Sequence, residues 1–223
     1  MVIISSKKQN QIFMEKFTIS GSILSVSENN SEKLLTKSLN DYINILEFNK
    51  KVQSYYTRLF KVEYYLSNEL KEIIPDFFVE YKNSSFELVF INSNDQEPYS
   101  ESEINIIKEF SLNNNIDLKF ETEKDISESI KLFNSNYLLD FKKPKYGFNL
   151  SDTDIIYNVL NDYNVLTIEG VLNVAVQSES KKAQLLYVIW VMIANYWIEF
   201  DESVKISTKS KVWNTRYNFE TNE

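Results

Sequence analysis

The sequence predicts an α/β fold over its first two thirds, followed by a smaller domain of three helices and a β-hairpin. Up to about residue 143, strand-like runs of apolar and aromatic residues alternate with stretches whose apolar residues recur every three or four positions. Beyond about residue 150, helical spacing dominates until two short strand-like runs follow. The first pattern is typical of a sheet flanked by helices.

The first domain is expected over residues 1–143. A strand-like piece at Phe17 to Val26 precedes a helix from Ser31 to Phe48, for which Ser31 is a plausible N-cap. Further elements are expected in this order: strands at Val52 to Tyr56 and Phe60 to Leu66, a turn at Ser67-Asn68, strands within 75–82 and 86–92, a helix from Ser102 to Phe110, a strand from Ile116 to Glu121, and a helix from Ile126 to Leu139.

A linker is expected at Lys142 to Asn149, which contains a proline and a glycine and lacks periodicity. The second domain, residues 150–223, begins with a helix that Ser151 would cap. Three helices and a hairpin in about 70 residues fit a winged helix. The expected elements are helices at Ser151 to Tyr163, Thr167 to Val176 and Ser180 to Asn195, and strands at Tyr196 to Asp201 and Val204 to Thr208.

The composition excludes several kinds of chemistry. The chain has no cysteine and no histidine, which removes thiol nucleophiles, disulfides, the usual zinc sites and serine–histidine catalysis. Any metal would have to be a hard cation such as Mg²⁺ or Mn²⁺ held by carboxylates. No apolar run is long enough for a signal peptide or a membrane span, so we expect a cytoplasmic protein with no membrane partner.

The formal net charge of −8 opposes broad binding to a DNA backbone. Lysine clusters could still form a local patch. Lys181 and Lys182, at the start of the third helix of the second domain, are candidate phosphate contacts, and so are Lys209 and Lys211 near the hairpin. The alternative is that these lysines simply solvate the surface. DNA is therefore a possible partner that the chain would bind weakly alone.

Residues 75–92 carry most of the chemical information. Pro75-Asp76 opens a strand, and a second strand presents Phe90 and Asn92 on one face. This is the frame of the PD-(D/E)xK nuclease site, whose second strand bears an acid and a lysine two residues apart. In that frame the acids hold a divalent metal, and the lysine steadies the attacking water or the developing phosphate charge. Without such partners, Asp76 can also be interpreted as a strand-entry residue that binds nearby backbone amides.

The chain resembles the TnsA family, the endonuclease subunit of heteromeric bacterial transposases, from roughly Phe17 to Trp213. The order and spacing of the segments carry the resemblance more than any one of them. The similar segments are Leu39 to Phe48, Lys51 to Tyr55, Ile74 to Glu80, Lys119 to Ile126, Leu132 to Leu139, Leu166 to Leu172, Ile198 to Asp201 and Thr208 to Val212.

The resemblance implies a restriction-endonuclease-like first domain, a winged-helix second domain, and a transposase subunit and an AAA+ ATPase regulator as partners. It also implies a metal site, from which this chain departs. Leu39 stands where the family has a glutamate, and Phe90 and Asn92 stand where it has an acid or glutamine and a lysine. Only Asp76 is retained. We therefore expect a TnsA-like docking or regulatory subunit with a degenerate nuclease site and no cofactor.

Two other functions stay open. The chain could be an endonuclease dependent on Mg²⁺ or Mn²⁺ that cleaves transposon ends through a rearranged site with Asp76 and Glu80 as metal ligands. Glu80 lies four residues along the same strand, whereas Glu87 has the parity opposite to Phe90 and should face elsewhere. It could also be a nuclease-fold protein of a phage or defence system.

Overall fold

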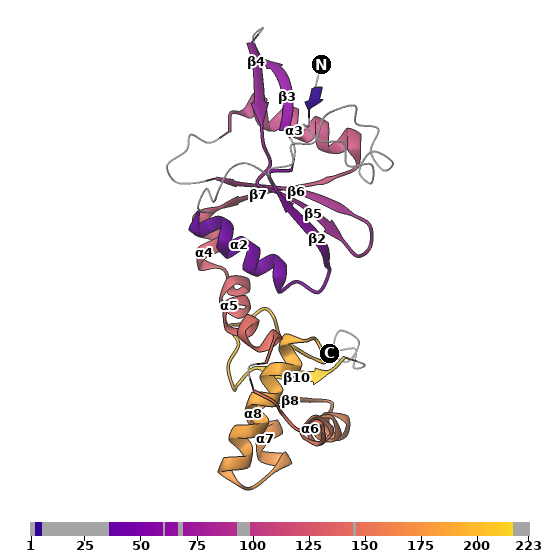
Figure 1. Cartoon of the computed structure of the whole chain (residues 1–223), viewed down its shortest axis with the longest axis vertical. Helices are drawn as coiled ribbons and strands as arrows, with labels where there is room; N and C mark the ends of the chain where they lie inside the picture. Colours follow the sequence, from indigo (N-terminus) through magenta and orange to yellow (C-terminus); the bar gives the residue numbers. More distant parts are fainter. Residues whose placement is uncertain are drawn as a thin grey trace. The chain divides into compact units, whose positions relative to one another are not determined.

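The protein has a mixed α/β fold, as expected. The computed structural model describes residues 3–5, 36–59, 61–66, 69–92, 99–144 and 146–215. The chain divides into two compact units, Met1–Ser127 and Glu128–Glu223 (Figure 1). The strand expected at 17–26, the N-cap expected at Ser31 and the turn expected at 67–68 lie outside the described residues.

The central sheet of the first unit has the strand order β2-β5-β6-β7. The first three strands pair antiparallel, whereas β6 and β7 run parallel. A parallel pair needs a crossover connection, which α3 provides. The four strands and this helix confirm the predicted elements. Their bounds are β2 Val52–Thr57, β5 Phe77–Tyr81, β6 Phe86–Asn92, α3 Glu101–Asn114 and β7 Asp117–Thr122.

Two helices cover opposite faces of this sheet (Figure 1). On the α3 face, Phe78 and Phe90 belong to one buried cluster with Ile107 of α3. On the α2 face, Tyr42 of α2 (Lys37–Glu47) contacts Phe77 with ring centroids 5.1 Å apart. The two central strands, β5 and β6, therefore bury residues of both parities, which explains the nearly continuous apolar run of β5.

A second sheet in the first unit has the order β1-β3-β4, with bounds β1 Ile3–Ser5, β3 Lys61–Leu66 and β4 Glu69–Ile73. The sequence did not predict β4, because four of its five residues are exposed and three are charged. The α2 helix begins after Thr36, whose hydroxyl accepts a hydrogen bond from the Leu39 N–H at 3.4 Å. Thr36 thus acts as the N-cap.

The single helix predicted from Ile126 to Leu139 is wrong. Two helices occupy the region, α4 (Glu123–Glu128) and α5 (Ile130–Lys142). Ser129 separates them, because its hydroxyl accepts from the Leu132 N–H at 3.1 Å and caps α5. The α5 helix packs on α8 and belongs to the second unit, so the linker expected after Lys142 joins two helices of that unit.

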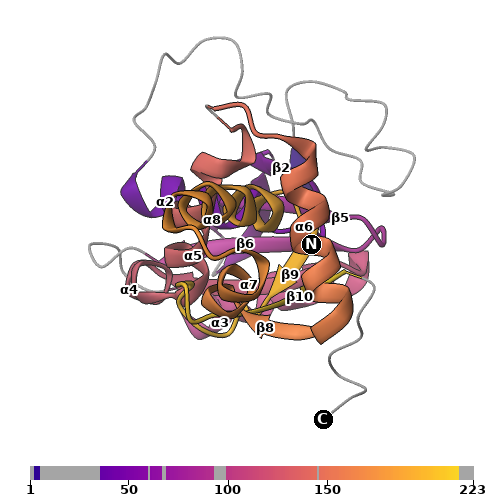
Figure 2. The ribbon, with the colours of Figure 1, turned by 90° about the horizontal axis from the view of Figure 1, so that it is seen from below.

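The second unit continues with three more helices and a small sheet (Figure 2). In that sheet β10 lies between β8 and β9, and both pairs are antiparallel. The α8 helix forms the core, with every residue from 188 to 194 buried. None of the described helices combines the length and apolarity needed to cross a bilayer. The bounds are α6 Leu150–Tyr163, β8 Val165–Thr167, α7 Ile168–Ala175, α8 Glu179–Ala194, β9 Ile198–Phe200 and β10 Lys211–Asn214.

The strand predicted at Val204 to Thr208 is also wrong, because these residues form the loop between β9 and β10. Backbone groups of this loop form hydrogen bonds with the buried side chain of Asn134, on α5, instead of with a neighbouring strand. Its Nδ2 donates to the Val204 carbonyl at 3.0 Å, and its Oδ1 accepts from the Ile206 N–H at 2.8 Å. Similarly, Asn149 caps α6 where Ser151 was predicted, since its Oδ1 accepts from the Ser151 N–H at 3.1 Å.

We predict that Asn134→Ala destabilises the second unit by about 1–3 kcal/mol, because it leaves buried backbone groups without a partner. Urea unfolding measures the effect. Lys131→Ala, on an exposed position of the same helix, is the control and should change the free energy of unfolding by less than about 0.5 kcal/mol. Equal effects of the two substitutions would show that Asn134 does not anchor the loop.

Candidate functional site

Asp76 lies just before β5 and is fixed by four contacts. Its N–H donates to the Val89 carbonyl at 2.9 Å, and its own carbonyl accepts from the Arg58 N–H at 3.1 Å. Its Oδ2 accepts from the Ile91 N–H at 2.8 Å. Its Oδ1 lies 3.6 Å from Nη2 of Arg58, and the side chain is 13% exposed. Both carboxylate oxygens are therefore engaged within the protein.

Burial raises the pKa of the Asp76 carboxyl above its ordinary value of 3.8, although the Ile91 N–H and the Arg58 guanidinium act in the opposite direction. Arg58 has a φ of 47°, in the left-handed region that residues with a side chain seldom adopt. Its half-exposed side chain reaches back to Asp76 from this conformation. The pair thus combines a costly buried charge with a strained backbone.

Phe90 occupies the position beside Asp76, because β5 and β6 pair Phe77 with Val89. Phe90 is fully buried. Its ring lies 5.3 Å from that of Phe120 and 5.6 Å from that of Tyr99, between centroids. These aromatic rings fill the space in which the nuclease frame requires an acid.

Of the other predicted site residues, Leu39 and Glu80 lie away from Asp76, whereas Asn92 follows Ile91, whose N–H donates to the Asp76 carboxylate. Leu39 is buried on the same side of α2 as Tyr42, whose ring packs on the face of the sheet that α2 covers. Phe90 lies on the opposite face, which α3 covers. Glu80 accepts a hydrogen bond from Ser54 at 2.9 Å, and its place four residues along the strand is roughly 13 Å from Asp76. Asn92 is half-buried at the end of β6.

The carboxylates near Asp76 do not form a metal-binding group. Among the residues that the structure describes, no three acidic side chains lie close enough together to hold a cation. Mg²⁺ and Mn²⁺ need several oxygen ligands in a defined geometry. Asp76 offers one side chain, so the other ligands of a metal there would have to be water or a bound substrate.

Two of the candidate DNA-contact lysines have partners within the second unit. The Lys181 ammonium lies 2.7 and 3.0 Å from the two carboxylate oxygens of Asp152. Lys182 donates to Glu179 and to Asn173, both at 2.9 Å. Lys209 and Lys211 are exposed, on the loop after β9 and on β10. The two lysines at the start of α8 therefore interact with side chains of the same unit.

A polar cluster on the α2 face was missed by the sequence analysis. Lys119 lies 2.7 Å from Glu121 and donates to the Tyr42 hydroxyl at 3.4 Å, while the Tyr81 hydroxyl donates to Glu87 at 2.8 Å. Burial, followed by the charges of Glu87 and Glu121, raises the pKa of Tyr42. These five residues are called the α2-face cluster below.

A sequence signal for the α2-face cluster existed. Lys119 and Glu121 are two residues apart on β7, which is the spacing that the nuclease frame requires, but with the lysine before the acid and on the strand after β6. Parallel pairing of β6 with β7 places Glu87 opposite Asp117, on the same face. The sequence alone did not show that α2 would cover this face.

No family model and no curated protein matches this chain.

We predict that Asp76 lowers the stability of the folded protein by an amount that depends on pH. Because its folded-state pKa is raised, folding favours the protonated carboxyl, and stability is lost as the pH rises through and beyond 3.8. The free energy of unfolding of the wild type, minus that of Asp76→Asn, should therefore fall between about pH 3 and about pH 7. Urea unfolding at several pH values measures it. A difference that grows with pH would mean that Arg58 and Ile91 outweigh the burial.

Proposed function

We propose that this protein is a TnsA-like subunit of a DNA transposition machinery with a degenerate nuclease site. It acts as a docking or regulatory protein for the transposase or for its ATPase regulator. The observation that carries the proposal is the aromatic packing beside Asp76, where Phe90, Tyr99 and Phe120 fill the position of the missing acid. This packing favours a scaffold role over a catalytic one.

The order of the elements supports the same reading. In the first unit, a helix, three antiparallel strands and a crossover helix to a parallel strand are consistent with a restriction-endonuclease-like sheet. In the second unit, the elements that follow α5 have the order α6, β8, α7, α8, β9, β10, with β10 at the centre of the sheet, which is consistent with a winged helix. Both orders support the two domain types that the resemblance implies, but α5 belongs to the second unit instead of the first.

The chemistry of phosphodiester cleavage explains why the aromatic packing supports a scaffold role. A nuclease must place a metal-bound water in line with the scissile phosphate and neutralise the charge that develops on its oxygens. Asp76 has both oxygens engaged, and the neighbouring rings supply neither a ligand nor a charge. The formal net charge of −8 also favours protein surfaces over bare DNA.

A retained metal-dependent endonuclease is the second candidate, and one observation favours it. In the α2-face cluster, Lys119 lies against Glu121, and Glu87 lies on the same face of the neighbouring parallel strand, four residues away in register. It differs from the rearranged site proposed around Asp76 and Glu80. The Lys119 ammonium already lies against Glu121, so a metal there would have to displace it.

The experiment that tests the proposed function first identifies the genes beside its own, and then combines the full chain with any transposase and ATPase regulator that they encode. We expect it to form a complex with one of them on size-exclusion chromatography. We also expect no cleavage of transposon-end DNA in Mg²⁺ or Mn²⁺, with or without the partners. Asp76→Ala should behave as the wild type in both assays.

Three outcomes would contradict the proposed function. Metal-dependent nicking that Asp76→Ala abolishes would show that the site is rearranged but active. Nicking that Glu121→Ala abolishes while Asp76→Ala does not would assign the chemistry to the α2-face cluster. Neighbouring genes without a transposase would favour a phage or defence role.

A further inference from the structure

A pocket of about 570 Å³ lies at the end of the central sheet away from Asp76, where β5 finishes and β6 begins. This volume is in the range of sites that hold small ligands. Its lining combines basic, acidic and neutral polar side chains: Lys50, Lys51, Tyr81, Lys82, Asn83, Ser85, Glu87 and Asp117. It is called the lysine pocket below.

The α2–β2 connection and the β5–β6 turn carry the lysines of this pocket, and a backbone hydrogen bond joins these two segments. Lys50 and Lys51 follow α2, and Lys82 begins the turn between β5 and β6. The Lys82 N–H donates to the Lys51 carbonyl at 2.9 Å. Ser84 completes the turn with a φ of 62°, and the turn closes with a Tyr81 N–H to Ser85 carbonyl bond of 2.9 Å. The lysine stems therefore start from a hydrogen-bonded backbone.

The charge of these lysines is directed outward. All three are exposed. Among the described residues, neither Lys51 nor Lys82 forms an ion pair, whereas Lys50 also interacts with a group of the protein itself. Three ammonium groups at the rim of one pocket suit a multiply charged oxyanion, for which lysine serves as a point-charge donor.

Two carboxylates in the lining of the pocket, Glu87 and Asp117, limit which anions could bind there. Glu87 already accepts a hydrogen bond from the Tyr81 hydroxyl, and Asp117 is its exposed neighbour on β7. Carboxylates repel a bare phosphate but accept hydrogen bonds from hydroxyl or amino groups. A nucleotide carries all of these groups, because it joins a phosphate to sugar hydroxyls and base amines.

We propose that the lysine pocket binds a nucleotide phosphate, with Lys50, Lys51 and Lys82 as its cationic contacts. The phosphate comes either from a free nucleotide or from a nucleic-acid backbone, and the chemistry at the lysines is the same. The pocket is separate from Asp76. The proposal that it binds phosphate does not depend on the proposed function of the protein.

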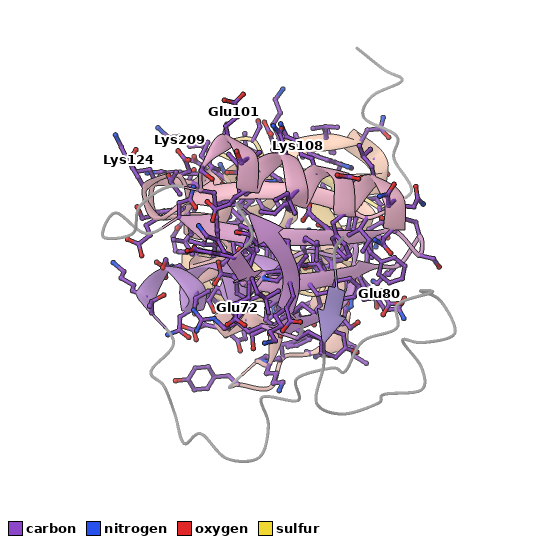
Figure 3. All side chains as sticks on the ribbon, turned by 90° about the horizontal axis from the view of Figure 1, so that it is seen from above. Glu72, Glu80, Glu101, Lys108, Lys124 and Lys209 are labelled. Atoms are coloured by element: carbon purple, nitrogen blue, oxygen red, sulfur yellow. The ribbon has the colours of Figure 1, made fainter. Side chains whose placement is uncertain are left out.

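The test compares two double variants of the full chain. Lys51→Gln/Lys82→Gln removes two charges from the pocket. Lys108→Gln/Lys124→Gln removes two charges from exposed positions on α3 and α4 of the same unit (Figure 3). Fluorescence anisotropy measures binding to a labelled DNA duplex between about 50 and 200 mM salt, and calorimetry measures binding of ATP and of tripolyphosphate.

If the backbone is the source, three contacts predict a log–log salt slope of roughly −2.7, hence about a 40-fold loss of affinity across that range. The pocket variant should reduce the slope by about 1.8, and the control variant should keep it. If a free nucleotide is the source, ATP should bind the wild type and the control but at least about tenfold more weakly to the pocket variant. Equal losses in both variants, or no binding of any of the three probes by the wild type, would overturn the proposal.

Discussion

The register between β5 and β6 is the constraint on which the surroundings of Asp76 depend. Pairing Phe77 with Val89 sets Asp76 beside Phe90 and brings its carboxylate to the Ile91 N–H. A slip of one residue would move each side chain to the other face of the sheet and expose the α3-face core. The same burial that stabilises this sheet therefore fixes an aromatic ring where a nuclease would need an acid.

Much of the central sheet could be predicted from local pattern, and the failures have identifiable causes. Strands β2, β5 and β6 are rich in β-branched and aromatic residues. By contrast, the false strand at 204–208 has a strand-like sequence, but its backbone partners come from Asn134, about 70 residues earlier. The break at Ser129 depends on one capping hydroxyl within an apolar pattern that looks continuous.

For the candidate site, the sequence could predict only which residues of one strand share a face of the sheet. Spacing along one strand correctly separated Glu87 from Phe90. It could not show that Leu39 lies on the other face from Phe90, because the side of the sheet that a helix covers is set by tertiary packing. The α2-face cluster was missed for the same reason, since its five residues come from α2, β5, β6 and β7. The engagement of Lys181 by Asp152 likewise joins two helices.

The most direct test of the account is a thermal melt of the full chain in millimolar Mn²⁺. A cation that binds only the folded state raises the melting temperature. Because Arg58, the Ile91 N–H and an aromatic wall surround the single carboxylate of Asp76, the melting temperature should not change with Mn²⁺. A rise of several degrees that Asp76→Asn abolishes would contradict the claim that the site beside Asp76 has lost its metal.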